Sequence, residues 1–205
     1  RGVYTFCMCP GGEVIAAASE PGGVVTNGMS YSGRAMPNCN SALLAAVRPE
    51  DFPYPGALGG VLWQREIERL AFEYAGGNYS APAQLVGDFL ENRASSGPGK
   101  VKPSYLPGVF WGDLRRVLPD VVTNSLNSAL PLLAGKLPLF GDGEAVLTGP
   151  ETRSSSPVRI PRGADRQCAV RGLYPCGEGP GWAGGITSAA VDGLRVAEAV
   201  MEAAR

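Results

Sequence analysis

A glycine-rich segment near the end of the sequence has the composition and position of a ligand-binding loop. Residues 177–185 have the sequence GEGPGWAGG. The stretch 172–178, which leads into them and shares Gly177 and Glu178 with them, predicts a short buried strand. Residues 186–201 follow, with Ile186, Ala190, Leu194, Ala197 and Met201 at the spacing of one helix face. A strand, a glycine loop and a helix present backbone N–H groups and the positive end of a helix dipole to an electron-rich ligand.

Residues 179–184 also match the spacing G-x-G-x-x-G of a dinucleotide-binding loop. Only 21 residues follow Gly184, and the helix uses them. No second strand is left to carry the acidic residue expected about 20 residues further on. The segment therefore predicts the closing strand, loop and helix of a nucleotide-binding domain that begins elsewhere. Because the chain begins at Arg1 inside a strand-like run, we expect a fragment of a longer protein.

Two cysteines form a C-x-C pair, Cys7 and Cys9, directly before Pro10-Gly11-Gly12. Residues two apart on a strand face the same side, so the pair has the arrangement for a metal or a strained disulfide. Zinc would need two more ligands, and C-x-x-C is the usual redox spacing. We expect buried structural thiols and no metal site. Cys176, beside the glycine loop, is a further thiol candidate.

The composition excludes several classes of function. The chain has no histidine, which rules out His-dependent triads, Cys–His dyads and HExxH zinc sites within it. A net charge of −1 gives no sign of a nucleic-acid or anionic membrane surface. No apolar run approaches the roughly 20 residues of a membrane span, and no signal peptide is visible. Five cysteines without a disulfide framework fit a reducing compartment, so we predict a cytoplasmic protein.

The first fifty residues predict an antiparallel β-meander. Three strand-like runs, 3–9, 13–18 and 24–31, are separated by two Pro-Gly-Gly turns, and a fourth run covers 41–47. Polar residues follow the meander in a dense cluster with the character of a substrate-pocket loop: Tyr31, Arg34, Asn38 and Asn40. A surface loop with turn-forming Asn is the alternative.

Helical patterns follow the meander. In the segment 60–74, the residues Trp63, Ile67, Leu70 and Tyr74 form one apolar face. Further helices are predicted at 80–90, 114–118 and 121–133. With 205 residues and 44% hydrophobic side chains, the chain has room for an α+β domain with a sizeable core, or a domain and a half.

Five stretches of the sequence resemble known flavoproteins. They are 4–31 (YTFCMCPGGEVIAAASEPGGVVTNGMSY), 81–90 (APAQLVGDFL), 103–109 (PSYLPGV), 148–160 (TGPETRSSSPVRI) and 172–199 (GLYPCGEGPGWAGGITSAAVDGLRVAEA). They resemble the C-terminal part of uncharacterised FAD-dependent dehydrogenases, FAD-utilising oxidoreductases that are distant relatives of the glutathione-reductase type of flavoprotein. Two departures are Trp182, where Tyr is usual, and Cys39, where a small residue is expected.

The resemblance implies a split domain. An N-terminal Rossmann unit of the same polypeptide would bind the ADP half of FAD, and 1–147 would be an inserted cap or substrate domain. Residues 148–205 would be the return segment that completes the Rossmann-like FAD-binding domain. The implied activity is a dehydrogenase that transfers hydride through the flavin ring to or from a small-molecule substrate. NAD(P)H is an electron partner by analogy alone.

The resemblance also implies cofactor-binding residues, with Glu178 accepting hydrogen bonds from ribityl hydroxyls. The set is Gly177, Glu178, Gly179, Gly181, Trp182, Ala183, Gly184, Gly185, Ile186, Glu151, Thr152 and Arg153. Trp182 would lie beside the ring or in the core. No residue is assigned as catalytic. The alternatives are a structural glycine turn, a solvated loop at 151–153 and a cofactor-free binding or structural module derived from a flavoprotein. By itself this part of the protein is expected to be inactive.

Overall fold

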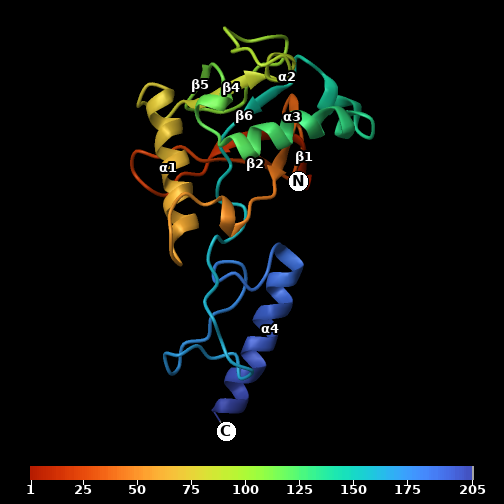
Figure 1. Cartoon of the computed structure of the whole chain (residues 1–205). Helices are drawn as coiled ribbons and strands as arrows, with labels where there is room; N and C mark the ends of the chain where they lie inside the picture. The colour runs from red at the N-terminus through yellow and green to blue at the C-terminus, as the bar shows by residue number, and fades with distance from the viewer. Residues whose placement is uncertain (205) are drawn as a thin grey trace. The chain divides into compact units, whose positions relative to one another are not determined.

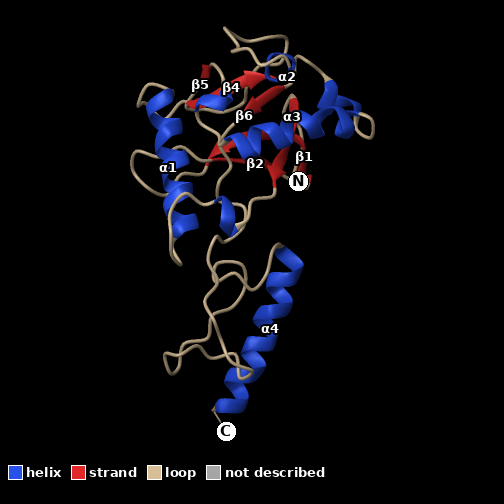
Figure 2. Ribbon diagram, in the orientation of Figure 1, coloured by secondary structure: helices blue, strands red, loops and turns tan. Residues whose placement is uncertain are grey.

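The computed structural model describes residues 1–204, which form two three-stranded sheets and four α-helices (Figure 1, Figure 2). The strands are β1 Val3–Ala16, β2 Thr26–Ser30, β3 Asn38–Ala45, β4 Ala81–Leu85, β5 Val109–Trp111 and β6 Val146–Thr148. The helices are α1 Gly59–Tyr74, α2 Val86–Leu90, α3 Asp120–Ala134 and α4 Ile186–Ala203. Short 3₁₀ helices are η1 Pro49–Asp51, η2 Leu114–Arg116 and η3 Pro138–Gly141. The fold class expected from the sequence is α/β, with an α+β cap domain joined to part of a split Rossmann-like domain; the described residues form a small α+β fold with two small sheets.

The chain divides into two compact units. The first contains residues 1–52 and 63–152, and the second contains 53–62 and the chain from Arg153 onward. Both sheets lie in the first unit, whereas the second has α4 and long irregular segments (Figure 2). None of the helices formed by residues 1–204 has the length and apolar character that a membrane span requires.

The first sheet has the order β2-β1-β3, and both pairings are antiparallel. The turn expected at Pro10-Gly11-Gly12 is wrong, because these residues lie inside the single long strand β1. A Cβ on Gly11 would collide with the carbonyl oxygen of Arg34, and a Cβ on Gly12 with that of Met29. The glycines therefore permit close approach of neighbouring backbone rather than a reversal of the chain.

The expected meander is wrong in its strand order, because β3 pairs with β1 rather than with β2. The second expected turn is confirmed. Pro21-Gly22-Gly23 reverses the chain, with Gly22 at φ +73° and the Ala17 N–H donating to the Val25 carbonyl at 2.8 Å. The strand that follows is shorter than the run 24–31, and β3 begins three residues before the run 41–47.

The second sheet has the order β5-β4-β6, with β4 parallel to β5 and antiparallel to β6. The helix expected over 80–90 is wrong for its first half. Residues Ala81–Gln84 are buried and belong to the central strand, and only Val86–Leu90 are helical. Pairing with strands on both sides overrides the local helical pattern.

The core of the first unit lies between α2, α3 and the sheets. Val86, Phe89, Leu126 and Leu130 form its buried centre, and side chains of β1, β3 and β6 pack around them. The predicted apolar face of α1 is confirmed: Trp63 and Ile67 are buried, and Leu70 and Tyr74 are half-buried. Of the run 114–118, only 114–116 is helical, as the 3₁₀ helix η2.

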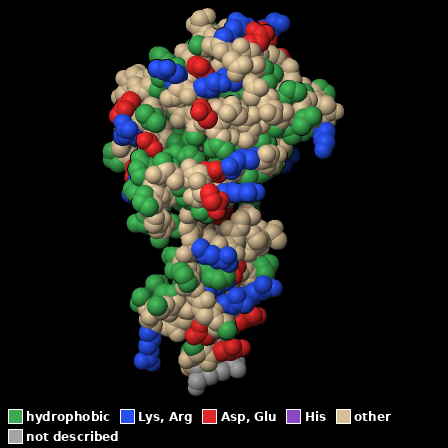
Figure 3. All heavy atoms as spheres, in the orientation of Figure 1, with side chains coloured by type: hydrophobic (Ala, Val, Ile, Leu, Met, Phe, Trp, Pro, Cys, Tyr) green, Lys and Arg blue, Asp and Glu red, His purple; other side chains and the backbone are tan. Residues whose placement is uncertain are grey.

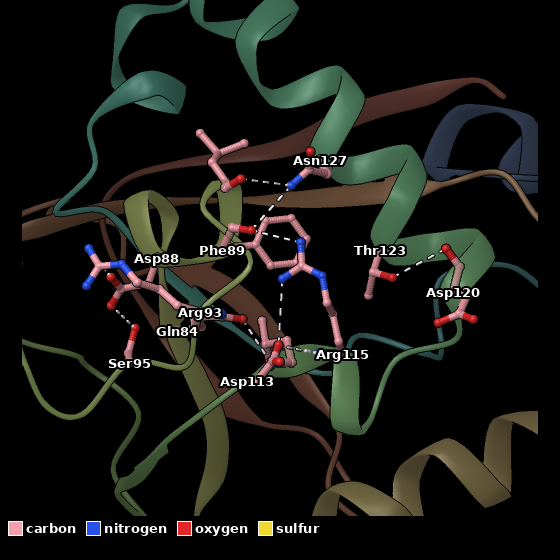
Figure 4. Close-up of polar contacts among 12 residues, drawn as sticks. Gln84, Asp88, Phe89, Arg93, Ser95, Asp113, Arg115, Asp120, Thr123 and Asn127 are labelled. Atoms are coloured by element: carbon pink, nitrogen blue, oxygen red, sulfur yellow. Dashed lines mark hydrogen bonds and ion pairs between the residues drawn. The ribbon is translucent and has the colours of Figure 1, made fainter.

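A polar network joins β4 to its surroundings (Figure 4). Gln84 is fully buried; its Nε2 donates to the Arg93 carbonyl at 2.8 Å, and its Oε1 accepts from the Leu114 N–H at 2.9 Å. Nearby, the Arg115 guanidinium lies 4.3 Å from the centre of the Phe89 ring and donates to the Phe89 carbonyl. Because both polar ends of the buried Gln84 amide have backbone partners, the network has a structural role.

Replacing Gln84 by Leu should lower the free energy of unfolding by about 2 kcal/mol, because it leaves a buried N–H and a buried carbonyl unpaired. Chemical denaturation measures the change. The matched control, Glu73→Gln, removes the exposed Arg69–Glu73 ion pair and should cost less than about 1 kcal/mol. Equal effects of the two substitutions would show that the Gln84 network has no special weight.

Candidate functional site

The glycine segment forms a loop closed by its own backbone. The N–H groups of Trp182 and Ala183 both donate to the Gly177 carbonyl at 3.1 Å, and the Gly181 N–H donates to the Glu178 carbonyl at 2.9 Å. Gly177, Gly181 and Gly185 have φ values of +79°, +78° and +114°. These are conformations that glycine adopts without a Cβ clash, which explains the composition of the loop.

The strand expected at 172–178 is absent from the described chain, where a turn at Arg171-Gly172 leads into irregular backbone. The Leu173 N–H donates to the Val170 carbonyl, and the Cys168 N–H donates to the Leu173 carbonyl. A strand needs a neighbour for its hydrogen bonds, and residues 1–204 provide none for this segment.

An ion pair attaches the glycine loop to α4. Arg162 donates to both carboxylate oxygens of Asp192, at 2.9 and 2.5 Å, and to the Pro175 carbonyl at 2.6 Å. The Asp192 carboxylate also accepts from the Gly177 N–H at 2.9 Å. The Arg162 side chain is 2% exposed, so solvent screens this pair little. The first turn of the loop is thereby fixed to the helix that follows it.

The indole of Trp182 lies between two cations. Its ring centre is 3.9 Å from the Arg159 guanidinium and 4.1 Å from that of Arg162, and its Nε1 donates to the Ile160 carbonyl at 2.8 Å. The side chain thus packs within its own unit and supports the Arg162 ion pair.

The N-terminus of α4 adjoins the loop. Gly185 is the N-cap and provides no side chain to cap the first turn, so the first N–H groups of the helix lack acceptors within it. A Cβ on Gly179, Gly184 or Gly185 would meet no described atom within 4 Å. This end of the helix can therefore accept an electron-rich ligand.

Helix α4 has one buried side and one exposed apolar side. Asp192 and Val196 are buried against the preceding segment. The face expected to pack in a core is exposed instead, with Ile186 92%, Leu194 68% and Met201 59% exposed. Figure 3 shows hydrophobic side chains at the surface of this unit. The unit that contains α4 does not provide the surface that this apolar face would need.

The three candidates at 151–153 fall on both sides of the unit boundary, with Glu151 and Thr152 in the first unit and Arg153 in the second. The Thr152 hydroxyl donates to Glu68 Oε1 at 2.5 Å, so it is held by α1. Glu151 is half-buried, and burial raises the pKa of its carboxyl. Its carboxylate has no hydrogen-bond partner among residues 1–204, so it remains available to bind another group.

The four candidate substrate residues lie around β1, each beside Gly11, Gly12 or Glu13. The Tyr31 hydroxyl donates to Glu13 Oε1 at 2.7 Å, and Asn38 Nδ2 donates to the Lys102 carbonyl at 2.7 Å. The Asn40 amide is buried between Gly12 and Gly28 without a hydrogen bond in the described chain. Arg34 is exposed, in a left-handed conformation at φ +47°.

Glu13, Arg162 and Asp192 are three site residues that sequence reasoning missed. Glu13 is 6% exposed and pairs with Tyr31, so this hydrogen bond raises the pKa of the tyrosine. Asp192 could have been identified from the sequence, because it is an acidic residue on an otherwise apolar helix face. Its partner lies 30 residues earlier in an irregular segment, where no periodicity points to it.

The ion pair predicts an acid-sensitive loop. Hydrogen bonds from Arg162 lower the pKa of Asp192 from 3.8 to about 2, against the opposing effect of burial. Its stabilisation is therefore complete above pH 3.8 and is lost as the pH falls through about 2. Below pH 4, amide exchange of residues 177–185, corrected for the intrinsic rate, should accelerate progressively. In Asp192→Asn it should be roughly tenfold faster at neutral pH as well.

Glu198→Gln, on the exposed side of α4, is the control and should exchange like the wild type. Unchanged exchange in Asp192→Asn would mean that the ion pair does not hold the loop.

Comparisons with known proteins agree with the flavoprotein resemblance. The family described as "FAD-dependent protein, C-terminal domain-like" matches residues 1–154. An uncharacterized protein of Clostridium beijerinckii is 52% identical over 203 residues, which cover 98% of this chain and 38% of that protein. The chain thus spans less than two fifths of the length of the curated relative that it matches. The chain belongs to the family of FAD-dependent protein C-terminal domains.

Proposed function

We propose that the chain is the C-terminal part of an FAD-dependent oxidoreductase, a dehydrogenase that transfers hydride through the flavin ring to or from a small-molecule substrate. The family match over residues 1–154 supports the link to FAD. The observation that carries the proposal is the exposed apolar face of α4, directly beside a glycine loop with open space around Gly179, Gly184 and Gly185. A helix with that face needs a partner, and the curated relative is long enough to contain one.

In this proposal, residues 1–147 form an inserted cap or substrate domain. Residues 148–205 are the return segment of a split Rossmann-like FAD-binding domain, whose first part lies in the remainder of the polypeptide. Two observations support this: the first unit has its own core, and the segment from Arg153 to Ala204 buries little besides Pro175, Asp192 and Val196.

The residues at the glycine loop fit a flavin nucleotide. When bound, FAD would supply a ring that accepts or releases a hydride. The backbone at Gly179 and Gly185 and the N-terminus of α4 at Ile186 would hold it, together with Glu178 and the 151–153 segment. Gly177, Gly181, Ala183 and Gly184 would shape the loop around it, since their N–H groups donate to Asp192, Glu178, Gly177 and Ser188.

Each of these groups has a distinct task. The N–H groups at the start of α4 would stabilise negative charge on the reduced flavin, because they lie at the positive end of the helix dipole. The Glu178 carboxylate accepts hydrogen bonds from hydroxyl groups. Asp192 and Arg162 keep the Gly177 N–H in place, and Trp182 covers Arg162.

No general acid or base is assigned. The chain has no histidine, so a proton must be moved by a carboxylate, a tyrosine, a cysteine, water or a group elsewhere in the polypeptide. On this chain, Glu151 is the carboxylate best suited to move a proton, because it is half-buried, has no hydrogen-bond partner within residues 1–204, and burial raises its pKa. The proposed electron partner is NAD(P)H and the proposed compartment is the cytoplasm.

The full-length protein should be yellow and absorb as a flavoprotein. Leu194→Glu places a charge on the apolar face of α4 and should weaken FAD retention roughly tenfold or more, since burial of an unpaired charge costs several kcal/mol. Absorbance after gel filtration measures the retained flavin. Arg195→Glu, which changes charge on an exposed position of the same helix, is the control and should retain FAD.

A full-length protein that stays colourless and takes up no added FAD would favour a cofactor-free module. Flavin retention by Leu194→Glu equal to that of the wild type would mean that this face does not support the cofactor site.

A further inference from the structure

The C-x-C pair of β1 is built differently from two thiols in a regular strand. Its sulfurs lie 3.8 Å apart and share a hydrogen bond. The register between β1 and β3 shifts between Phe6 and Cys9, and Cys7 has φ +51°. This left-handed conformation is unusual for a residue with a Cβ and is characteristic of strained functional positions. The bulge places the two sulfurs against each other.

The two thiols differ in accessibility. Cys7 is exposed, whereas Cys9 is 6% exposed. This asymmetry suits thiol–disulfide exchange, in which an accessible sulfur reacts first and a neighbouring sulfur resolves the mixed disulfide. Cys39, on β3, is exposed but has no cysteine partner in the described chain, so it provides an internal comparison.

Metal binding does not explain the pair. No group of three or more His, Cys, Asp or Glu side chains that could hold a metal ion is found among residues 1–204. Two thiolates alone fall short of the four ligands of a structural zinc site. The expectation of two buried structural thiols is also wrong for Cys7, because its side chain is exposed.

We propose that Cys7 and Cys9 are a redox-active dithiol that exchanges with a disulfide substrate. The Cys7 thiolate attacks the disulfide R–S–S–R, forms Cys7–S–S–R and releases one RS⁻, which takes up the proton lost by Cys7. Cys9 then attacks the Cys7 sulfur, closes Cys7–S–S–Cys9 and releases the second RSH with the Cys9 proton. The protein loses two electrons and two protons, and the disulfide gains them. The step needs no flavin, so it stands apart from the proposed cofactor site.

The surroundings of Cys7 determine how readily it forms a thiolate. The hydrogen bond with Cys9, burial and the nearby negative charge of Glu151 raise the pKa of Cys7. A raised pKa lowers the fraction of Cys7 that is thiolate at neutral pH, so its attack on a disulfide should become faster as the pH rises. Closing the bond brings the sulfurs from 3.8 Å to about 2 Å.

Trypsin separates the relevant cysteines for a direct test. The peptide 2–34 contains only Cys7 and Cys9, and the peptide 35–65, which retains the Arg48–Pro49 bond that trypsin does not cleave, contains only Cys39. The full-length protein is equilibrated with mixtures of oxidised and reduced glutathione, quenched with acid, alkylated, digested and weighed by mass spectrometry. Peptide 2–34 should change from doubly alkylated to an internal disulfide lighter by two hydrogens than the dithiol. Peptide 35–65, with its single cysteine, should be alkylated or carry one glutathione in proportion to the glutathione ratio.

Single substitutions test the order of the two steps. Cys9→Ala should accumulate a glutathione adduct on Cys7, since the resolving thiol is missing. Cys7→Ser should leave Cys9 alkylated and free of glutathione, and Cys39→Ser should behave like the wild type in peptide 2–34. Circular dichroism checks that each variant is folded. A wild-type peptide 2–34 that stays doubly alkylated at every ratio, or that carries two separate glutathiones, would overturn the proposal.

Discussion

A helix of eighteen residues must bury an apolar face, and α4 has more apolar surface than its own unit covers. Between Arg153 and Ala204 the buried residues are Pro175, Asp192 and Val196. So small a core cannot offset the conformational entropy lost by about fifty ordered residues. What holds this segment together is largely polar, namely the Arg162–Asp192 pair with Trp182 stacked over it. The remaining stabilisation must come from a surface that α4 covers.

The first unit meets the opposite condition. Phe89 and Leu130 are almost fully buried, and the polar groups that β4 brings inside have partners in Arg93 and Leu114. The family match ends at residue 154, two residues beyond this unit. Recognition of the family therefore rests on the part with its own core. The glycine loop lies outside the match, and its role rests on its geometry and its resemblance to flavoproteins.

The sequence pattern predicts elements well where a local period or a local turn decides the structure. The apolar faces of α1 and the turn at Pro21-Gly22-Gly23 are of this kind, and the helix at 186–201 also forms. The sequence pattern fails where residues far along the chain determine the structure. Pro10-Gly11-Gly12 has the composition of a turn, but the backbone of Arg34 and Met29 packs against its glycines and keeps it in a strand. In the same way, Ala81–Leu85 pair with two strands that lie far along the chain.

The same distinction between local and distant determinants applies to the candidate site. The loop at 177–185 can be predicted from its glycines, because each left-handed residue is a local requirement. The Arg162–Asp192 anchor and the contact of Cys7 with Cys9 cannot, because one joins distant segments and the other depends on a bulge in β1. The position of the substrate residues also follows from strand register, which puts Asn38 and Asn40 opposite Gly12 and Cys9.

The most direct test of the central claim is amide hydrogen exchange of α4, compared between the 205-residue chain and the full-length protein. If the face of Ile186, Leu194 and Met201 packs against the remainder of the polypeptide, the amides of α4 should exchange at least about a hundredfold more slowly in the full-length protein, a difference of roughly 3 kcal/mol in opening free energy. Equal exchange of α4 in the two proteins would contradict the account.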